Sequence, residues 1–498
     1  MFDVIECTIA QLLAAYLDGA ATARDVTQAY LDRIDRFDRR GPYLNAIIRV
    51  NSHALGVAEE LDSALRSSGR LSGPLHGIPV IVKDNLDTAD IPTTSGVACF
   101  KDFVPDRDAF IVGRLRSAGA IVLAKASLSE LSMGLADSIN SVLPGFTRNP
   151  YNTAYASGGS SGGTAVALAA NFGTVGLGTD TGGSVRAPAS INNLVGVRPT
   201  VGLVSRTGMA PLDSQRDTPG PMARTVEDAA RLLDVIAGAD PHDPRTATAA
   251  SHIPATYVPL PGSARVAARV GVLRQALALS AGADPRVVAL FDAAVADLGR
   301  VVTHVDAGFQ VPGLERFPIP PQTAARTRAD WDRFFASAGP RFPLQSVAQL
   351  RDLPPGKGVH PLHRPRIAEI AAVSVSPEDD PETVQGRQDE QMYREAFTQA
   401  MDRAQVEALV FPVWTYPPVI NGDRGQSLQG PLTHIGSATQ WPVVVVPIGF
   451  AGEQLPIGMQ ILGKPWTEAR LIQIAHAFEQ ATHHRRPPGG LSSDERKT

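Results

Sequence analysis

The chain has 498 residues, a formal net charge of −4 and a hydrophobic fraction of 43%, as expected for a globular protein. This length allows two or three domains, although single α/β units of this size occur. The slightly negative charge gives no electrostatic reason to expect binding to nucleic acid or to an anionic membrane. The two cysteines, Cys7 and Cys99, exclude a disulfide scaffold, so we expect a cytoplasmic protein.

The N-terminal residues do not predict a signal peptide, because MFDVIECTIAQLL carries acids and lacks a basic segment. No apolar run approaches the roughly 18 residues of a transmembrane helix. Two amphipathic helices are expected within the first forty residues, since Thr8 with Gln11 and Thr22 with Asp25 have the spacing of capping boxes.

From residue 77 onward, short apolar runs alternate with helical patterns, which indicates an α/β fold with a largely buried sheet. The polar tail, 483–498, is expected to be disordered. The expected strands are 78–82, 121–124, 175–177, 270–273, 408–413 and 443–447, and the expected helices include 109–118, 164–171, 285–298 and 467–482.

Lys83 lies at the end of the apolar run GIPVIVKDN in a chain with only six lysines. Burial disfavours the charged ammonium and lowers its pKa, which makes a lysine usable as a general base. Two structural interpretations compete with this one: the side chain reaches solvent from the strand end, or it pairs with Asp84.

Ser160 lies in the glycine-rich segment SGGSSGGTAVALAAN, and this segment has several interpretations. A phosphate-binding loop lacks support, because neither a preceding strand nor a Gly-Lys-Ser/Thr end is present. Gly158, Ser160 and Gly162 match the G-x-S-x-G of a nucleophile elbow, but the preceding residues are polar where an elbow follows a buried strand. A flexible linker is disfavoured by the apolar helix that follows.

Ser184 follows the apolar run 175–177 in the segment GLGTDTGGSVRAPAS, with a double glycine before it and a helix start near Pro188. The backbone N–H groups of such a turn converge, which suits an oxyanion. A tight turn with a capping serine is the structural alternative.

Together these segments resemble the signature of the amidase signature family. The matching residues are Lys83, Ser160 and Ser184, with the two serines 24 positions apart. The resemblance covers roughly 60–240 and 405–480, and it includes LAKASLSELSMG, TRNPYN, GVRPT, DTPGPMART, VVVVPIGF and LPIGMQILG. Two departures are the Gln440-Trp441-Pro442 sequence, where the family has Gly-Leu-Pro, and the unfamiliar stretch 245–400.

The resemblance implies one α/β/α domain, 1–482, with helices around a large central mixed sheet. The variable substrate-side region would span 245–400. The implied roles are nucleophile for Ser184, proton relay for Ser160 in a cis Gly159–Ser160 peptide, and base for neutral Lys83. The family's oxyanion hole implies the backbone amides of Thr181, Gly182, Gly183 and Ser184, with Asp180, Arg186, Ser161 and Gly159 as supporting residues.

The resemblance implies an amidohydrolase of linear amides that needs no cofactor or metal and acts as a monomer or homodimer on a small molecule. The aromatic segment 309–342 favours a neutral apolar or aryl amide, anilide or carbamate, with esterase or urethanase side activity. The candidate pocket residues are Met133, Trp331, Phe335, Trp414 and Trp441. Packing of these aromatic side chains into the core is an equal alternative.

Three other functions compete with this one. The amidotransferase subunit of glutamyl-tRNA amidation shares the signature; it would use glutamine and need a partner subunit. A Ser-His-Asp hydrolase would use Ser160 as nucleophile, with His434 or His476 as base. A non-catalytic binding protein would carry no serine that a fluorophosphonate labels.

Overall fold

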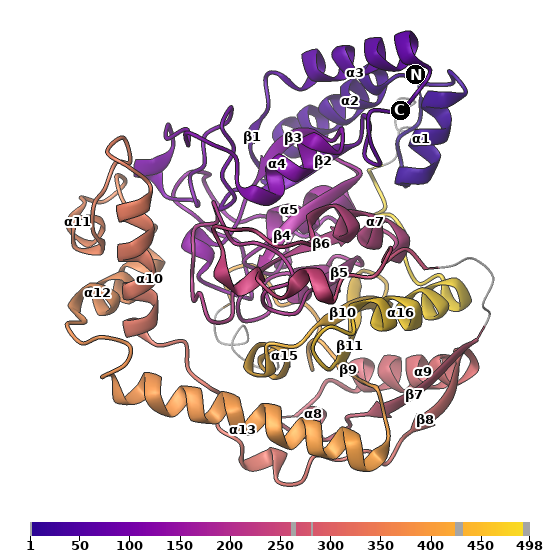
Figure 1. The fold of residues 1–498 in the computed structure, drawn as a ribbon, viewed down its shortest axis with the longest axis vertical. Helices are drawn as coiled ribbons and strands as arrows, with labels where there is room; N and C mark the ends of the chain where they lie inside the picture. Colours follow the sequence, from indigo (N-terminus) through magenta and orange to yellow (C-terminus); the bar gives the residue numbers. More distant parts are fainter. Residues whose placement is uncertain (1, 260–264, 280–281, 424–431, 492–498) are drawn as a thin grey trace.

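A computed structural model describes residues 2–259, 265–279, 282–423 and 432–491. The described strands form one mixed sheet of eleven strands (Figure 1). In sheet order they are β1 (Ile47–Val50), β3 (Ile121–Ala126), β2 (Pro79–Lys83), β4 (Val175–Asp180), β6 (Thr218–Ala223), β5 (Val195–Arg198), β10 (Val443–Ala451), β11 (Leu455–Gly463), β9 (Ala408–Pro412), β7 (Val266–Val272) and β8 (Val302–Asp306). The predicted α/β fold with a large mixed sheet is confirmed.

Helices surround the sheet (Figure 1). They are α1 (Ile9–Leu17), α2 (Ala23–Arg33), α3 (Ala54–Ser68), α4 (Phe110–Ser117), α5 (Gly162–Ala169), α6 (Arg186–Ile191), α7 (Val226–Ile236), α8 (Gln275–Ala278), α9 (Pro285–Val301), α10 (Ala324–Ser337), α11 (Val347–Asp352), α12 (Arg364–Ala372), α13 (Pro381–Ala404), α15 (His434–Thr439) and α16 (Glu468–Thr482). In the described part of the chain, no helix is long and apolar enough to cross a bilayer.

The first two helices begin where the sequence predicts. Thr8 accepts a hydrogen bond from the Gln11 N–H, and Thr22 accepts one from the Asp25 N–H, so both capping boxes are formed. Each box satisfies backbone donors that a helix start leaves unpaired, which fixes the point where the helix begins.

The strands that matter most for function, β3, β2 and β4, lie side by side and run parallel. Every residue of these strands is buried, which explains why they read as continuous apolar runs. Because parallel strands end at the same edge of a sheet, the segments after Lys83 and Asp180 meet there.

The unfamiliar region 245–400 divides between two places. Strands β7 and β8 extend the sheet at one end, whereas α10, α11 and α12 form a separate group of helices on the left of Figure 1. Trp331 and Phe335 of α10 pack in one apolar cluster with Phe100 and Leu131, which lie outside this region. The region therefore contributes both to the sheet and to the group of helices, α10 to α12, beside it.

The expectation of a disordered tail from residue 483 is wrong for the part that the structure describes, 483–491; the rest lies outside the described residues. Arg485 fixes this part. Its guanidinium forms an ion pair with Glu6 at 2.8 Å and donates to the Tyr151 hydroxyl at 2.6 Å and to the carbonyl of Asn193. These partners are far away in sequence, so the polar composition of the tail did not reveal them.

We expect Arg485→Ala to lower the free energy of unfolding by about 2 kcal/mol, because it leaves the half-buried Glu6 carboxylate without its cation. Urea denaturation followed by circular dichroism measures this loss. Arg403→Ala, at an exposed arginine, is the matched control. Equal stability of the two variants would contradict the role of Arg485.

Candidate active site

Lys83 is completely buried at the end of β2, and its amine lies between two hydroxyl groups. The Nζ atom is 2.7 Å from Ser160 Oγ and 2.7 Å from Thr179 Oγ1. Burial lowers the pKa of Lys83 to about 7, although the negative charges of Asp180 and Asp217 oppose this shift. A large share of the amine is therefore uncharged near neutral pH.

Neither structural interpretation of Lys83 agrees with the structure. The side chain does not reach solvent, since none of its surface is exposed. Asp84 pairs with a different lysine, Lys125, whose Nζ lies 3.0 Å from Asp84 Oδ1. Lys125 is equally buried, so this pair keeps the Asp84 charge compensated next to Lys83.

The Ser160 loop is held tightly against its neighbours. The Gly159–Ser160 peptide is cis, as the resemblance implies. A Cβ on Gly159 would collide with Ser129 Oγ and with the backbone oxygens of Asp137 and Gly134, so a glycine is required. The Ser161 hydroxyl donates to the Thr179 carbonyl at 3.2 Å, which fixes the loop to the end of β4.

Ser184 lies beside this loop, directly before α6. The Ser161 N–H donates to the Ser184 carbonyl at 3.2 Å, which joins the two serine segments through their backbones. Ser184 is only 3% exposed, but a Cβ at the neighbouring Gly182 would meet nothing within 4 Å. Among the described residues, the Ser184 hydroxyl makes no hydrogen bond.

The turn 181–184 offers fewer oxyanion donors than predicted. The Gly183 N–H donates to Asp180 Oδ1 at 2.9 Å, so the prediction that Gly183 supplies a free donor is wrong. Within the described residues, the N–H groups of Thr181, Gly182 and Ser184 have no acceptor. Gly183 has φ +131°, and a Cβ there would collide with Thr433, so this position needs glycine for a reason of its own.

Asp180 and Arg186 are completely buried beside the turn and pair with each other. Burial alone would raise the pKa of Asp180, but the guanidinium groups of Arg186 and Arg198 hold it well below its usual range. Arg186 also donates to the Thr433 carbonyl at 2.7 Å and to Gln460 at 3.0 Å. Through these contacts Arg186 braces the turn, which is the supporting role that the resemblance implies for it.

The candidate pocket residues do not meet in one wall. Trp331 and Phe335, with Met133 against them, belong to the apolar cluster under α10, and Trp331 donates its indole N–H to the Pro211 carbonyl at 2.8 Å. Trp414 and Trp441 belong to two other clusters. The structure therefore supports the core-packing alternative for this set.

A cleft lies beside Asp217, and both polar and apolar groups line it. The cleft has a volume of about 990 Å³, and the Asp217 carboxylate at its edge accepts the Thr181 hydroxyl hydrogen. Its lining combines charged side chains of both signs, such as Arg206 and Asp330, with apolar side chains such as Met209 and Phe334.

The nucleophile-elbow hypothesis for Ser160 is wrong. No strand precedes Ser160; the described residues 149–160 form turns and isolated bridges. The partner of the Ser160 hydroxyl is an amine rather than an imidazole. His476 lies on α16 beside Glu479, and His434 lies edge-on to Tyr393, so each histidine faces a different neighbour.

The family model described as Amidase matches residues 25–472. The chain belongs to the amidase signature family. The predicted resemblance is thereby confirmed, and it extends across the stretch 245–400 that the sequence motifs did not cover.

Members of this family with different names are similarly close to the chain. It is 34% identical to a glutamyl-tRNA(Gln) amidotransferase subunit of Salinispora tropica, over 98% of this chain and 100% of that protein. The same subunit of the Myxococcus xanthus enzyme is 34% identical over 96% of this chain and 98% of its own length. The native peptide amidase of Stenotrophomonas maltophilia has 35% identity and a TM-score of 0.84, with 98% and 99% of the two chains covered.

Two residues of this candidate site were missed by the sequence motifs. Thr179 was read only as part of GTDTGGS, yet its hydroxyl accepts from Lys83 and also from Asn85 at 3.1 Å. Arg198 was read only as part of GVRPT, yet its guanidinium pairs with Asp180 at 2.7 Å. A buried arginine in an apolar strand is the signal that indicates such a role.

We expect Thr179→Val to slow labelling of Ser184 by a fluorophosphonate about tenfold or more. The valine keeps the shape but removes the acceptor that orients the Lys83 amine, and general-base catalysis contributes about 10²–10⁴-fold to such reactions. Time-resolved mass spectrometry of the labelled protein gives the rate. Thr179→Ser keeps the hydroxyl and should label at nearly the wild-type rate; a fast Thr179→Val would contradict this role.

We also expect the labelling rate to rise with pH through a midpoint near 7. Below that pH, Lys83 is charged and cannot accept a proton; above it, the amine is neutral and can. The rate is measured between pH 5.5 and 9. Lys83→Met should remove this dependence, whereas Lys101→Met, at an exposed lysine, should keep it. A midpoint near the ordinary lysine pKa would count against a neutral base.

Proposed function

We propose that the chain hydrolyses a carboxylic amide, with Ser184 as nucleophile, Ser160 as proton relay and Lys83 as base. The observation that carries this proposal is the buried Lys83 amine, 2.7 Å from Ser160 Oγ and with a pKa of about 7. A lysine in this state accepts a proton near neutral pH, which the nucleophilic hydroxyl must lose.

The first half of the reaction forms an acyl-enzyme. Ser184 Oγ bonds to the amide carbon while its proton passes to Ser160, whose own proton passes to Lys83. The free N–H groups of Thr181, Gly182 and Ser184 are the donors for the carbonyl oxygen as it gains negative charge. The C–N bond then breaks, and the proton returns from Lys83 through Ser160 to the leaving nitrogen.

The second half releases the acid. A water molecule gives its proton to the relay and attacks the ester of Ser184, and the returning proton restores the Ser184 hydroxyl. Asp180, Arg186 and Ser161 take no part in the proton transfers in this proposal. They hold the two serine segments in place through the contacts described above.

Two substrate classes remain, and the comparisons favour one of them. Relatives named as glutamyl-tRNA(Gln) amidotransferase subunits support a glutamine-using subunit of a multi-subunit enzyme better than a hydrolase of apolar or aryl amides. The core position of Trp331 and Phe335 also removes the support for an aryl pocket. The peptide amidase neighbour favours a peptide amide as the second class.

A hydrolysis panel separates these classes. It contains glutamine, a C-terminal peptide amide, an anilide, a carbamate and an ester, each with wild-type protein and with Ser184→Ala. Ammonia release from the peptide amide by the isolated chain supports a peptide amidase. Poor glutamine hydrolysis that increases when partner subunits are added supports an amidotransferase component.

We expect Ser184→Ala to abolish turnover, and a Ser184→Ala protein as active as the wild type would overturn the proposal. We expect Lys83→Ala to slow amide hydrolysis more than hydrolysis of an activated ester. An amide nitrogen needs a proton to leave, whereas a phenolate leaves without one. Initial rates on matched acyl groups give the two losses, and equal losses would contradict proton donation by Lys83.

A further inference from the structure

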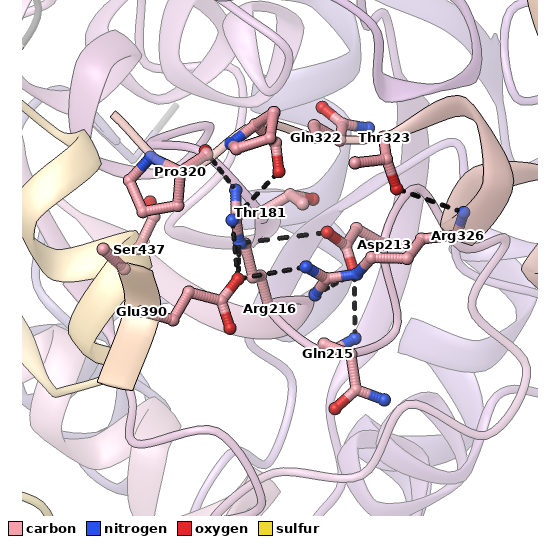
Figure 2. A network of polar contacts seen from close by, with 12 residues as sticks. Thr181, Asp213, Gln215, Arg216, Pro320, Gln322, Thr323, Arg326, Glu390 and Ser437 are labelled. Carbon is pink, nitrogen blue, oxygen red and sulfur yellow. Dashed lines mark hydrogen bonds and ion pairs between the residues drawn. The ribbon is translucent and has the colours of Figure 1, made fainter. Parts of the chain in front are cut away.

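Four buried charges connect the variable region 245–400 with the turn 181–184, which we call the oxyanion turn (Figure 2). We call Asp213, Arg216, Arg326 and Glu390 the charge network. Asp213 and Arg216 precede β6, Arg326 belongs to α10, and Glu390 belongs to α13. None of the four side chains is more than 7% exposed. Three segments distant in sequence thus meet at one buried place beside Thr181, which Figure 2 shows at its centre.

The charges of the network balance, and its members are closely paired. Glu390 Oε1 lies 2.6 Å from Arg216 Nη2 and 3.0 Å from Arg326 Nη1. Asp213 Oδ1 lies 2.8 Å from Arg326 Nη2. Because a buried charge without its partner is costly, these pairs hold the three segments at fixed positions. Arg216 also donates to the Pro320 carbonyl, which adds a fourth fixed point.

The loop that carries Asp213 and Arg216 also holds the oxyanion turn, through two separate contacts. Asp217 accepts the N–H groups of Leu212 and Asp213 with one oxygen and the Thr181 hydroxyl with the other. Arg198 donates to the carbonyls of Arg216 and Asp180 at 2.9 and 2.7 Å. A shift of this loop would therefore move Asp180 and Thr181, the two residues at the start of the turn.

The turn needs support of this kind. Asp180 holds the Gly183 N–H, but among the described residues the Gly182 N–H has no acceptor, and Gly182 borders open space. On the opposite side, the Thr433 hydroxyl donates to the Gly182 carbonyl at 2.6 Å. Loop 212–217 and Thr433 thus hold the turn between them, and the loop is itself held by the charge network.

We propose that α10 and α13 of the variable region position the oxyanion turn through this charge network, with Glu390 as the positioning residue that joins both arginines. The inference rests on the proposed function of Ser184 and deepens it. Glu390 touches no reacting atom in this proposal. It acts by fixing where the N–H groups of Thr181 and Gly182 point, so it affects the chemical step more than reversible binding.

The test variant is Glu390→Gln, which keeps the size of the side chain and removes its charge. Fluorophosphonate labelling of Ser184 is the readout, because it needs no knowledge of the natural substrate. Ser184 Oγ bonds to phosphorus, fluoride leaves, and the proton passes to the relay. The phosphoryl oxygen gains negative charge at the position of the amide oxygen.

We expect the maximal inactivation rate to fall about tenfold or more, while the concentration for half-maximal rate and the pH midpoint stay unchanged, since small misplacements cost up to about 10²-fold. Glu395→Gln on the exposed side of α13 is the matched control and should label like the wild type. Wild-type labelling kinetics in Glu390→Gln, or a loss confined to reversible binding, would overturn the proposal.

A loss of folding would be separated from a loss of position by the thermal midpoint and by a second variant. The double variant Glu390→Gln with Arg326→Gln removes one charge of each sign, so the remaining Asp213–Arg216 pair keeps the site neutral. We expect it to fold and still to label slowly. Full recovery of the rate would show that charge balance, and not positioning, is what matters. If Ser184→Ala is labelled as fast as the wild type, the proposed function fails instead.

Discussion

The structure around the site depends on one constraint: the amine of Lys83 must lie in a dry interior next to a hydroxyl. A charged ammonium is poorly tolerated there, and the resulting pKa near 7 is what makes the residue a usable base. Strand β2 delivers Lys83 to this position, and parallel β4 delivers Thr179 to the same edge. The contact between Lys83 and Thr179 depends on the parallel pairing of β2 with β4. The sheet topology and the acid–base property of Lys83 are therefore linked.

This constraint also explains the charges that surround the amine. An isolated carboxylate beside Lys83 would restore its proton, yet Asp180 is needed to hold the turn. Two arginines, Arg186 and Arg198, pair with Asp180 and compensate its charge. Lys125, on the neighbouring strand β3, compensates the charge of Asp84 in the same way. Each of these two acids is thereby supplied with its own cation, and the amine of Lys83 is left to hydroxyl partners.

The sequence predicted the parts of this arrangement that are local. The apolar runs gave β2 and β4, the capping boxes gave the starts of α1 and α2, and the glycine-rich segments placed Ser160 and Ser184. Partners across the fold were not predictable in this way. Arg198 and Arg485 are polar residues whose acceptors are fixed only by the completed fold. The aromatic segment was ambiguous, because an apolar side chain fits a core and a pocket equally well.

The oxyanion turn shows why motif matching has a limit of a different kind. The motif supplied four backbone amides, but the side chain of Asp180 engages one of them. Which amides remain free depends on where the carboxylate lies, and that depends on Arg186 and Arg198. Sequence motifs name the backbone groups of a site, whereas the buried ion pairs decide which of those groups can act.

The proposed relay does not by itself select a substrate, since glutamine and a peptide amide would present the same carbonyl and nitrogen to Ser184. Selection has to come from groups beyond the relay. The region 245–400, which the motifs did not cover, supplies Arg326 and Glu390, and these meet the loop that holds the turn. We therefore expect a change in this region to alter how well the turn acts on a bound substrate. Because this effect passes through buried ion pairs, we infer that the region and the turn 181–184 are coupled in the chemical step.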